Sequence, residues 1–328
     1  MSFKVVITDF IPDTETEREV LGPDVDVVAL NALSEDEILF QVEDADAVLL
    51  YHLISLSRKS ISQMKKCRLI VRAGVGYDNV DWKYAREQGI NVCNVPDYGT
   101  EDVADSAIGL MLALTRGINF HNSRLRRGQG DWGFSEYAAV PRLRGRTFGI
   151  IGLGRIGTAA ALRAKALGMN VVFYDPYARD GTDKAVGAKR VETLDELLLQ
   201  TFVLSPHCPL TAETRHIVND ETIGTLPAGA YVVNTSRGGV VDVNAVLAGV
   251  TSGHLAGAGI DVLETEPPSG DEPFIKAWRD PSHAAHDRII VNPHTAFYCE
   301  EGLGEMRLKA VQNVARVLSG AEPRNLVN

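Results

Sequence analysis

Short apolar runs alternate with amphipathic segments along nearly the whole chain. Such alternation is typical of βαβ units, in which parallel strands are buried on both faces and helices connect them. The first series of apolar runs precedes residue 100 and comprises FKVVIT, VDVVAL, ADAVLLY, RLIVR and INVCNV. The second series begins at Thr147 and comprises TFGIIG, NVVFYD, TFVLSP, AYVVNT, LAGAGIDV and RIIVNP. The pattern predicts an α/β protein with five strands in the first series and six in the second.

Local sequence features predict where several helices begin and where one loop lies. Ser34 and Thr193 are each followed three residues later by a glutamate, which is the spacing of a capping box. Asp242 is expected to cap a further helix. A last helix is expected near residues 304–318. Residues 267–287 contain Pro, His, Asp and Trp without a clear period, and they are expected to form a long surface loop.

Length and charge narrow the functional classes. A chain of 328 residues is long enough for about two domains with buried cores. Its 43 acidic and 33 basic residues give a net charge of −10, which disfavours nucleic acid and anionic membranes as partners. The four cysteines are scattered, so neither disulfides nor a metal site are expected. The apolar stretches are too short to span a bilayer, and we expect a soluble cytoplasmic protein.

A glycine-rich turn follows the first strand of the second series. Residues 152–157, GLGRIG, match G-x-G-x-x-G, and a helical segment follows them. Such a turn lets backbone N–H groups approach a pyrophosphate at a helix N-terminus. Asp175 ends the next strand, 23 residues after Gly152, where a carboxylate hydrogen-bonds the adenosine ribose of a dinucleotide. Because that carboxylate repels a 2′-phosphate, the sequence predicts NAD binding and makes NADP the less favoured cofactor.

Three polar residues lie just beyond later strands of the same series, namely Arg237, Glu266 and His294. The carboxyl ends of parallel strands are where open α/β sheets bind ligands. Arginine pairs bidentately with a carboxylate, and histidine exchanges a proton near neutral pH. A glutamate beside the histidine favours the imidazolium and fixes the tautomer. Together with NAD, these residue types predict oxidation of a 2-hydroxy acid or reduction of a 2-keto acid.

Several longer segments resemble the D-isomer-specific 2-hydroxyacid dehydrogenase family. They are RAGVGYDNVD, NVPDYGTEDVADSAIGLMLALTR, GIIGLGRIG, VVNTSRGGVVD, GAGIDVLETEP and NPHTA. Within the family, the chain is most similar to the branch of the C-terminal-binding proteins and its bacterial relatives. The resemblance implies two Rossmann-like lobes, with a doubly wound NAD-binding domain inserted in a flavodoxin-like substrate domain. The expected boundaries are 1–99 with 296–328 for the substrate domain and 100–295 for the NAD-binding domain. The family also implies a homodimer.

The same resemblance implies roles at matching positions. His294 would be the general acid/base, Glu266 its partner, and Arg237 the group that orients the substrate carboxylate. The expected cofactor-binding residues are Gly152, Gly154, Arg155, Ile156, Gly157, Asp175, Cys208, Pro209, Thr214, Thr235, Ser236 and Asp261. The expected substrate-binding residues are His52, Arg72, Val75, Gly76 and Phe297.

Two departures from the family bear on the substrate. Phosphoglycerate dehydrogenases carry a basic residue on the loop that here contains Tyr51, His52 and Leu53, so this sequence weakens a phosphorylated substrate. The C-terminal-binding protein branch has a tryptophan where this chain has Phe297, followed by Tyr298. Three functions therefore stay open: a 2-ketoacid reductase acting on a small 2-keto or 2-hydroxy acid, a phosphoglycerate dehydrogenase, and an NAD(H)-sensing binding protein.

Overall fold

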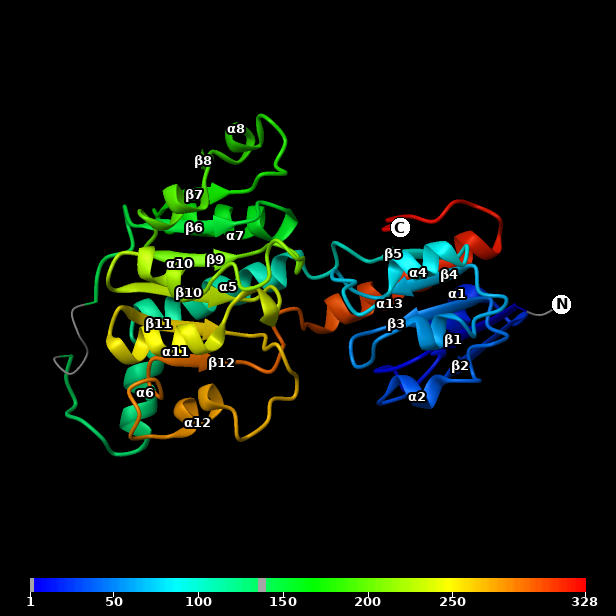
Figure 1. The fold of residues 1–328 in the computed structure, drawn as a ribbon, viewed down its shortest axis with the longest axis horizontal. Coiled ribbons are helices and arrows are strands. Elements are labelled where there is room, and N and C mark those ends of the chain that lie inside the picture. Colours follow the sequence, from blue (N-terminus) through cyan, green and yellow to red (C-terminus); the bar gives the residue numbers. More distant parts are fainter. Residues whose placement is uncertain (1–2, 135–139) are drawn as a thin grey trace. The chain divides into compact units, whose positions relative to one another are not determined.

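The computed structural model describes residues 3–134 and 140–328 of the chain and divides into two compact units. Unit 1 comprises Met1–Gly99 and Tyr298–Asn328, and unit 2 comprises Thr100–Phe297 (Figure 1). The chain returns to unit 1 between residues 297 and 298, whereas the sequence placed this boundary between 295 and 296. In the described part of the chain, no helix combines the length and apolar character needed to cross a membrane.

Unit 1 is built on a parallel five-stranded sheet in the order β2-β1-β3-β4-β5. This is the flavodoxin-like order, so the predicted fold of this lobe is confirmed. Its five apolar runs are the five strands that the sequence predicts. The strands are β1 (Phe3–Ile7), β2 (Val25–Ala29), β3 (Ala47–Leu50), β4 (Leu69–Arg72) and β5 (Asn91–Asn94). The helices are α1 (Glu15–Leu21), α2 (Glu35–Ile38), α3 (Arg58–Ile61), α4 (Trp82–Glu87) and α13 (Glu300–Leu318).

Unit 2 contains a parallel seven-stranded sheet in the order β12-β11-β10-β9-β6-β7-β8. Counted from β6, this is the Rossmann order with one further strand, so the doubly wound prediction is confirmed. The chain reverses its direction of winding between β6 and β9, which is the switch point of the sheet. The strands are β6 (Thr147–Ile151), β7 (Asn170–Tyr174), β8 (Lys189–Val191), β9 (Val203–Pro206), β10 (Ala230–Asn234), β11 (Leu255–Ile260) and β12 (Ile289–Val291).

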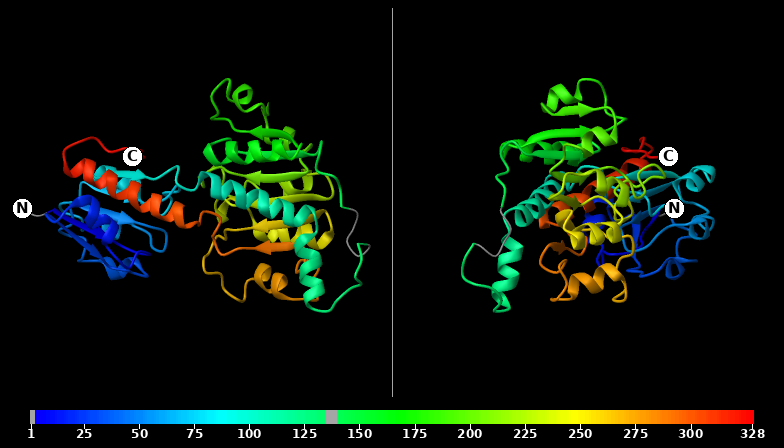
Figure 2. Two further views of the ribbon diagram at one scale, coloured as in Figure 1. Left: turned by 180° about the vertical axis from the view of Figure 1, so that it is seen from behind. Right: turned by 60° about the vertical axis from the view of Figure 1, so that its left-hand side comes forward.

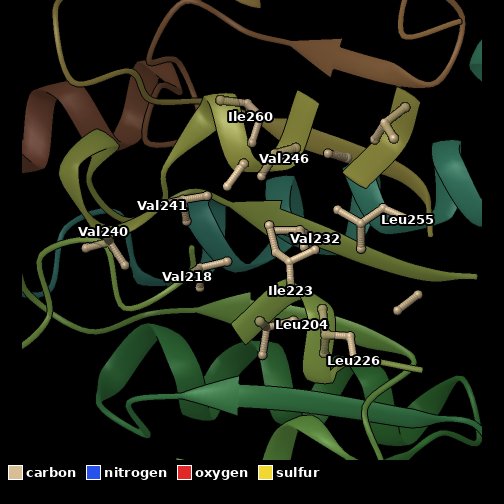
Figure 3. Packing of buried hydrophobic residues seen from close by; sticks show 14 of the residues in the cluster. Leu204, Val218, Ile223, Leu226, Val232, Val240, Val241, Val246, Leu255 and Ile260 are labelled. Carbon is tan, nitrogen blue, oxygen red and sulfur yellow. The ribbon is translucent and has the colours of Figure 1, made fainter. Parts of the chain in front are cut away.

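Helices cover both faces of this sheet. They are α5 (Thr100–Thr115), α6 (Ile118–Arg126), α7 (Arg155–Ala166), α8 (Thr182–Val186), α9 (Leu194–Leu198), α10 (Asp220–Thr225), η1 (Gly238–Val240), α11 (Val243–Ser252) and α12 (Pro273–Arg279). Figure 2 shows α5 and α7 lying across one face, where they bury a cluster that includes Met111 and Phe148. On the other face, Ile223 of α10 and Val246 of α11 pack on Val232 of β10 (Figure 3).

Two expectations for unit 2 were wrong. The sheet has seven strands rather than six, because β8 adds a three-residue edge strand whose alternating KRV sequence lacks the apolar run of a central strand. Residues 267–287 are not a continuous loop, because Pro273 begins the seven-residue helix α12. Proline is favoured in the first turn of a helix, where its missing N–H is not needed. The apolar Phe274 and Ile275 are buried and hold α12 against the core.

Side-chain caps fix two of the predicted helix starts but not the third. Asp242 accepts hydrogen bonds from the N–H groups of Asn244 and Ala245, and Thr193 accepts one from the N–H of Glu196. Ser34 also precedes a helix, but its hydroxyl donates to the Glu37 carboxylate instead of accepting from the backbone. The Glu37 carboxylate also accepts from the N–H of Leu33, one residue before Ser34, so the capping box of Ser34 does not form.

Candidate active site

The candidate residues of unit 2 lie at the carboxyl ends of six neighbouring strands. In the order of the sheet, His294 follows β12, Asp261 and Glu266 follow β11, and residues 235–237 follow β10. Residues 208–214 follow β9, the glycine turn follows β6, and Asp175 follows β7. The residues with acid–base chemistry therefore occupy one end of this edge, and the glycine turn with Asp175 occupies the other. Open α/β sheets bind extended dinucleotides across such an edge.

The glycine turn joins β6 to α7 and tolerates no side chain at two of its three glycines. Gly152 has φ of +88°, and a Cβ there would lie 3.0 Å from the backbone of Cys208. A Cβ at Gly157 would lie 2.3 Å from the carbonyl oxygen of Gly152, so this glycine lets the helix approach the strand. A Cβ at Gly154 would meet nothing within 4 Å, which leaves the N-terminus of α7 open to a ligand. Arg155 and Ile156 form the first turn of that helix.

Asp175 is tied to the glycine turn through its carboxylate. Its Oδ2 accepts a hydrogen bond of 2.9 Å from the N–H of Leu153, and its Oδ1 accepts one of 2.9 Å from the N–H of Tyr177. Each carboxylate oxygen keeps a second lone pair that can accept from a hydroxyl group. The position therefore offers negative charge and acceptors beside the turn, which suits a ribose diol and opposes a phosphate.

The loop after β9 forms the next part of the edge. Cys208 is buried, and burial raises the pKa of its thiol to about 11, so it is uncharged at neutral pH. Pro209 is exposed, and its carbonyl accepts a hydrogen bond of 2.6 Å from the hydroxyl of Thr214. His207 precedes this pair, and burial lowers the pKa of its imidazole to about 4. His207 and Cys208 are therefore uncharged at neutral pH, whereas Glu213 of the same loop carries a carboxylate that accepts from the hydroxyl of Tyr177.

The turn after β10 carries Thr235, Ser236 and Arg237. The hydroxyl of Thr235 is buried and has no hydrogen-bond partner within residues 3–134 and 140–328. A buried polar atom of this kind is expected to bind a ligand or water. Arg237 donates from its guanidinium to the carbonyl of Ser236. A Cβ at Gly238 would lie 2.0 Å from the carbonyl carbon of Leu263, so the loops after β10 and β11 touch through their backbones.

Glu266 and His294 form a hydrogen-bonded ion pair. The distance from Nδ1 of His294 to Oε2 of Glu266 is 2.7 Å, and the other carboxylate oxygen accepts from the N–H of Leu263 at 2.7 Å. Burial alone would raise the pKa of Glu266, but the bonds from His294 and Leu263 and the charge of Arg237 lower it below its usual value. Glu266 is therefore ionised at neutral pH and orients the imidazole.

Asp261 holds the turn that carries His294. It is 1% exposed, and its carboxylate accepts hydrogen bonds from the N–H groups of Thr295 and Ala296 at 3.0 and 3.1 Å. Burial raises the pKa of Asp261 in spite of these bonds and the nearby charge of His294. His294 has φ of +54°, and its N–H donates to the carbonyl of Asp261. The ring of Phe297 lies 6.1 Å from that of His294 in an edge-on arrangement.

The expected substrate-binding residues of unit 1 form a cluster at the carboxyl edge of its own sheet. Gly74 has φ of +147°, and the guanidinium of Arg72 occupies the space that a Cβ of this residue would need. The Asn94 amide donates to the carbonyl of Val75 at 2.7 Å, which fixes the turn that leads to Gly76. The imidazole of His52 follows β3, and its ring centre lies 4.4 Å from that of Phe10. Within unit 1, the predicted residues therefore come from two adjacent strands.

Among residues 3–134 and 140–328, no group of three or more His, Cys, Asp or Glu side chains is arranged to hold a metal ion. The acidic and basic groups of the edge are instead engaged with each other and with backbone N–H groups, as the Glu266–His294 pair and Asp261 illustrate.

A comparison with protein-family models decides the family. Residues 108–296, more than half of the chain, match the model described as "D-isomer specific 2-hydroxyacid dehydrogenase, NAD binding domain". The chain belongs to the D-isomer-specific 2-hydroxyacid dehydrogenase family. The match covers the glycine turn and every candidate residue of the seven-stranded sheet, and the predicted family is confirmed.

The relatives of this 2-hydroxyacid dehydrogenase family member are named for different functions. The chain is 35% identical to C-terminal-binding protein 1 of Caenorhabditis elegans over 96% of its length and 43% of the relative. It is 34% identical to D-3-phosphoglycerate dehydrogenase of Methanocaldococcus jannaschii over 99% of its length and 59% of the relative. The chain thus spans about half the length of these relatives. The crystal structure of D-lactate dehydrogenase from Aquifex aeolicus, complexed with NAD and lactic acid, is 28% identical, with a TM-score of 0.85 and 96% of both chains covered.

The structure adds residues to the site that the sequence analysis missed. Asn234 is fully buried at the end of β10 and bonds to the turn that carries Arg237. Asp9 is fully buried in unit 1 and accepts from the N–H groups of Tyr51 and Leu53, on either side of His52. Both are polar residues directly after an apolar run. That position was the only available signal, and it does not distinguish a buried anchor from a solvated loop residue.

Proposed function

We propose that the chain is an NAD-dependent D-2-hydroxyacid dehydrogenase that reduces a small 2-keto acid or oxidises the corresponding 2-hydroxy acid. The observation that carries the proposal is the Glu266–His294 pair, joined at 2.7 Å, with the charge of Arg237 acting on the same carboxylate. A 2-keto acid has two adjacent polar groups, a carboxylate and a carbonyl. The arginine suits the carboxylate, and the acid–base pair beside it suits the carbonyl.

In this proposal Arg237 binds the substrate carboxylate through its planar guanidinium, which forms two parallel hydrogen bonds with such a group. The nearby carboxylate of Glu266 binds His294 and the N–H of Leu263. Arg237 thereby fixes the orientation of the carbonyl next to the carboxylate. Arg72 and the turn of Val75 and Gly76 in unit 1 would supply further contacts to the substrate.

His294 acts as the general acid in the reduction and as the general base in the oxidation. Its Nδ1 faces Glu266, so Nε2 is the nitrogen that gives a proton to the carbonyl oxygen or takes one from the hydroxyl. Glu266 stabilises the imidazolium and holds one ring orientation. Asp261 positions the same imidazole by binding the N–H groups of the two residues that follow it.

The residues present fit a nicotinamide dinucleotide. The open N-terminus of α7 at Gly154 suits a pyrophosphate, and the acceptors of Asp175 suit a ribose diol. The buried and unpartnered hydroxyl of Thr235 suits the polar substituent of a nicotinamide. When bound, NAD supplies the hydride-transfer chemistry. The charge of Asp175 favours NAD over NADP. The wild type should therefore bind NADPH more weakly than NADH, and Asp175→Asn should bring the two dissociation constants closer together.

The proposed chemistry is tested with the variant His294→Gln. The wild type is mixed with NADH and a panel of glyoxylate, pyruvate, hydroxypyruvate and phenylpyruvate, and NADH absorbance is followed. The variant should lose at least 100-fold in kcat while its dissociation constant for NADH, measured by fluorescence, stays within about twofold. Absence of turnover by the wild type on the whole panel would reject the proposal. Equal loss of NADH binding in the variant would assign His294 a structural role.

The same assay tests the two alternative functions, a phosphoglycerate dehydrogenase and an NAD(H)-sensing binding protein. Adding phosphohydroxypyruvate tests the phosphoglycerate alternative, since His52 and Leu53 provide no permanent positive charge on the loop after β3. We expect its kcat/KM to lie below that of hydroxypyruvate. A binding protein that senses NAD(H) would instead bind NADH tightly with negligible turnover of any panel member, and would capture a protein partner only in the presence of NADH.

We also propose that two copies of the chain associate as a homodimer, as the family resemblance implies. The supporting observation is the segment after α6, where the side chains of Trp132 and Phe134 are 92% and 91% exposed. Exposed aromatic residues of this size are enriched at interfaces. Light scattering after size-exclusion chromatography should give twice the chain mass of 35.6 kDa for the wild type. The double variant Trp132→Ser and Phe134→Ser should shift the population toward the monomer.

A further inference from the structure

The side chain of Asn234 connects the end of β10 to the turn that carries Arg237. Asn234 is fully buried. Its Oδ1 accepts hydrogen bonds from the N–H of Ser236 at 3.0 Å and from the hydroxyl of Ser236 at 2.8 Å. Its Nδ2 donates to the carbonyl of Arg237 at 3.0 Å. The amide therefore uses both its acceptor and its donor on the two residues that place the guanidinium.

The backbone of the same residue connects to the turn that carries His294. The carbonyl of Asn234 accepts from the N–H of Asp261 at 2.9 Å, and the carbonyl of Asp261 accepts from the N–H of His294 at 2.8 Å. The carboxylate of Asp261 then binds the next two N–H groups along the chain. Through two backbone hydrogen bonds, by way of Asp261, Asn234 therefore links the Arg237 turn after β10 to the His294 turn after β12.

We propose that Asn234 is a positioning residue that sets the spacing between Arg237 and His294. The inference rests on the proposed function and adds a determinant of substrate affinity to it. A 2-keto acid has a fixed short distance between its carboxylate and its carbonyl oxygen, so two groups that bind them must keep a matching distance. The backbone of Arg237 is extended, with φ of −141° and ψ of 143°, and it lies between β10 and the three-residue helix η1. The amide of Asn234 donates to its carbonyl from the side of β10, and the N–H of Val240 donates to the same carbonyl from the side of η1.

The residue type at position 234 follows from this arrangement. The turn presents one N–H and one hydroxyl that need an acceptor, and one carbonyl that needs a donor. An amide offers an acceptor oxygen and a separate donor nitrogen at fixed positions on one short side chain. An aspartate would keep the acceptor and lose the donor, and an alanine would lose both and leave the N–H and hydroxyl of Ser236 without this acceptor. Asn234→Asp should therefore disturb the position of Arg237 less than Asn234→Ala does.

A matched control separates positioning of Arg237 from a general contribution to stability. Asn313 is 5% exposed and, like Asn234, accepts from one backbone N–H and donates to one backbone carbonyl. Both partners belong to Arg324 in unit 1, whereas Arg237 and His294 belong to unit 2. Asn313→Ala therefore removes a comparable pair of bonds without touching the Arg237 turn.

The experiment compares Asn234→Ala, Asn234→Asp and Asn313→Ala with the wild type. We expect Asn234→Ala to raise KM for the best 2-keto acid at least tenfold and Asn234→Asp to raise it by a smaller factor. The dissociation constant for NADH should stay within about twofold in both. Oxalate, a dicarboxylate that resembles the substrate, is titrated calorimetrically into the protein saturated with NADH, and its affinity should fall by a factor similar to that of KM. Asn313→Ala should lower Tm and leave KM and oxalate affinity unchanged.

The outcomes distinguish the inference from the proposed function. An unchanged KM and oxalate affinity in Asn234→Ala would overturn the inference while the wild-type turnover still supports a dehydrogenase. A loss of NADH affinity as large as the loss of oxalate affinity would also overturn it, because that result describes a general collapse of the edge. If the wild type turns over no 2-keto acid, the oxalate titration decides the inference. Oxalate binding to the wild type that is lost in Asn234→Ala would support it, and absence of oxalate binding to the wild type would overturn it.

Discussion

The contact between the loops after β10 and β11 makes Gly238 a sensitive position, and Gly238→Ala tests the geometry of the proposed site. A Cβ there would lie 2.0 Å from the carbonyl carbon of Leu263 and 2.3 Å from the N atom of Glu264. Both atoms belong to the backbone, so they cannot move aside as a flexible side chain does. Ordinary contact begins near 3.4 Å, and the two loops must therefore separate by more than 1 Å.

That separation displaces the groups proposed to bind and protonate the substrate. Arg237 immediately precedes Gly238, and Glu266 follows Leu263 by three residues. A misplacement of about 1 Å at a reaction centre costs roughly 100-fold in rate, so kcat/KM should fall by about that factor. Overpacking of this kind costs about 1–3 kcal/mol, which in a domain of this size lowers Tm by roughly 2–12 °C. NADH affinity should change little, because the glycine turn and Asp175 lie at the other end of the edge.

Two other glycines provide the controls for this measurement. A Cβ at Gly224 in α10 would meet nothing within 4 Å, so Gly224→Ala should keep kcat/KM and leave Tm equal or slightly higher. A Cβ at Gly239 would lie 3.1 Å from the side chain of Leu210 and 3.6 Å from that of Arg215, both flexible, and Gly239→Ala should give an intermediate loss. Steady-state kinetics and thermal melts are measured on all three variants. If Gly238→Ala kept the kcat/KM and the Tm of the wild type, the reasoning would be refuted, whatever the results for Gly224→Ala and Gly239→Ala.

Two further predictions concern the cofactor edge and pH. Gly157→Ala should weaken NADH binding at least tenfold and lower Tm, because its Cβ would lie 2.3 Å from the carbonyl oxygen of Gly152. Gly154→Ala should also weaken NADH binding, but Tm should stay nearly unchanged because its Cβ would meet nothing within 4 Å. Equal Tm values for the two variants would contradict this. Burial lowers the pKa of His207 from 6.5 to about 4, so between these pH values the unfolded chain binds more protons and the free energy of unfolding falls as pH falls. The loss amounts to at most about 3 to 4 kcal/mol. In urea melts from pH 4 to 7, His207→Asn should show a weaker pH dependence than the wild type, and parallel curves would refute the assignment.

Hydrophobic periodicity was sufficient to predict the lobes, because central parallel strands are apolar on both faces. All five strands of unit 1 and six of the seven in unit 2 coincide with the apolar runs of the sequence. The missed strand, β8, lies at the sheet edge, and its three residues KRV include two charged side chains. The missed helix, α12, is held by two buried residues, Phe274 and Ile275, which are too few to produce a helical period.

The candidate site could be predicted only in part for a related reason. Gly152, Asp175 and His294 stand at positions where a spacing or a strand end limits the alternatives, and the sequence alone singled them out. The anchors of the site have no such marker. Asn234 and Asp261 act on backbone groups that a one-dimensional pattern does not bring together. The family resemblance implies that Asp261 binds the cofactor, and its observed bonds show in addition how it supports the His294 turn.

The interrupted course of unit 1 has a consequence for the order of events during synthesis. Strands β1–β5 leave the ribosome first, but α13, which packs on α1 and binds Glu17 through Arg307 at 2.7 Å, is made about 200 residues later. At about 5–20 residues per second, the nascent sheet waits roughly 10–40 s for this helix. All of unit 2 is translated within that interval and is ready to fold before unit 1 is finished. Unit 1, which begins the chain, is therefore the last unit to be completed. Until α13 is made, the apolar face of its sheet that this helix covers stays exposed to chaperones.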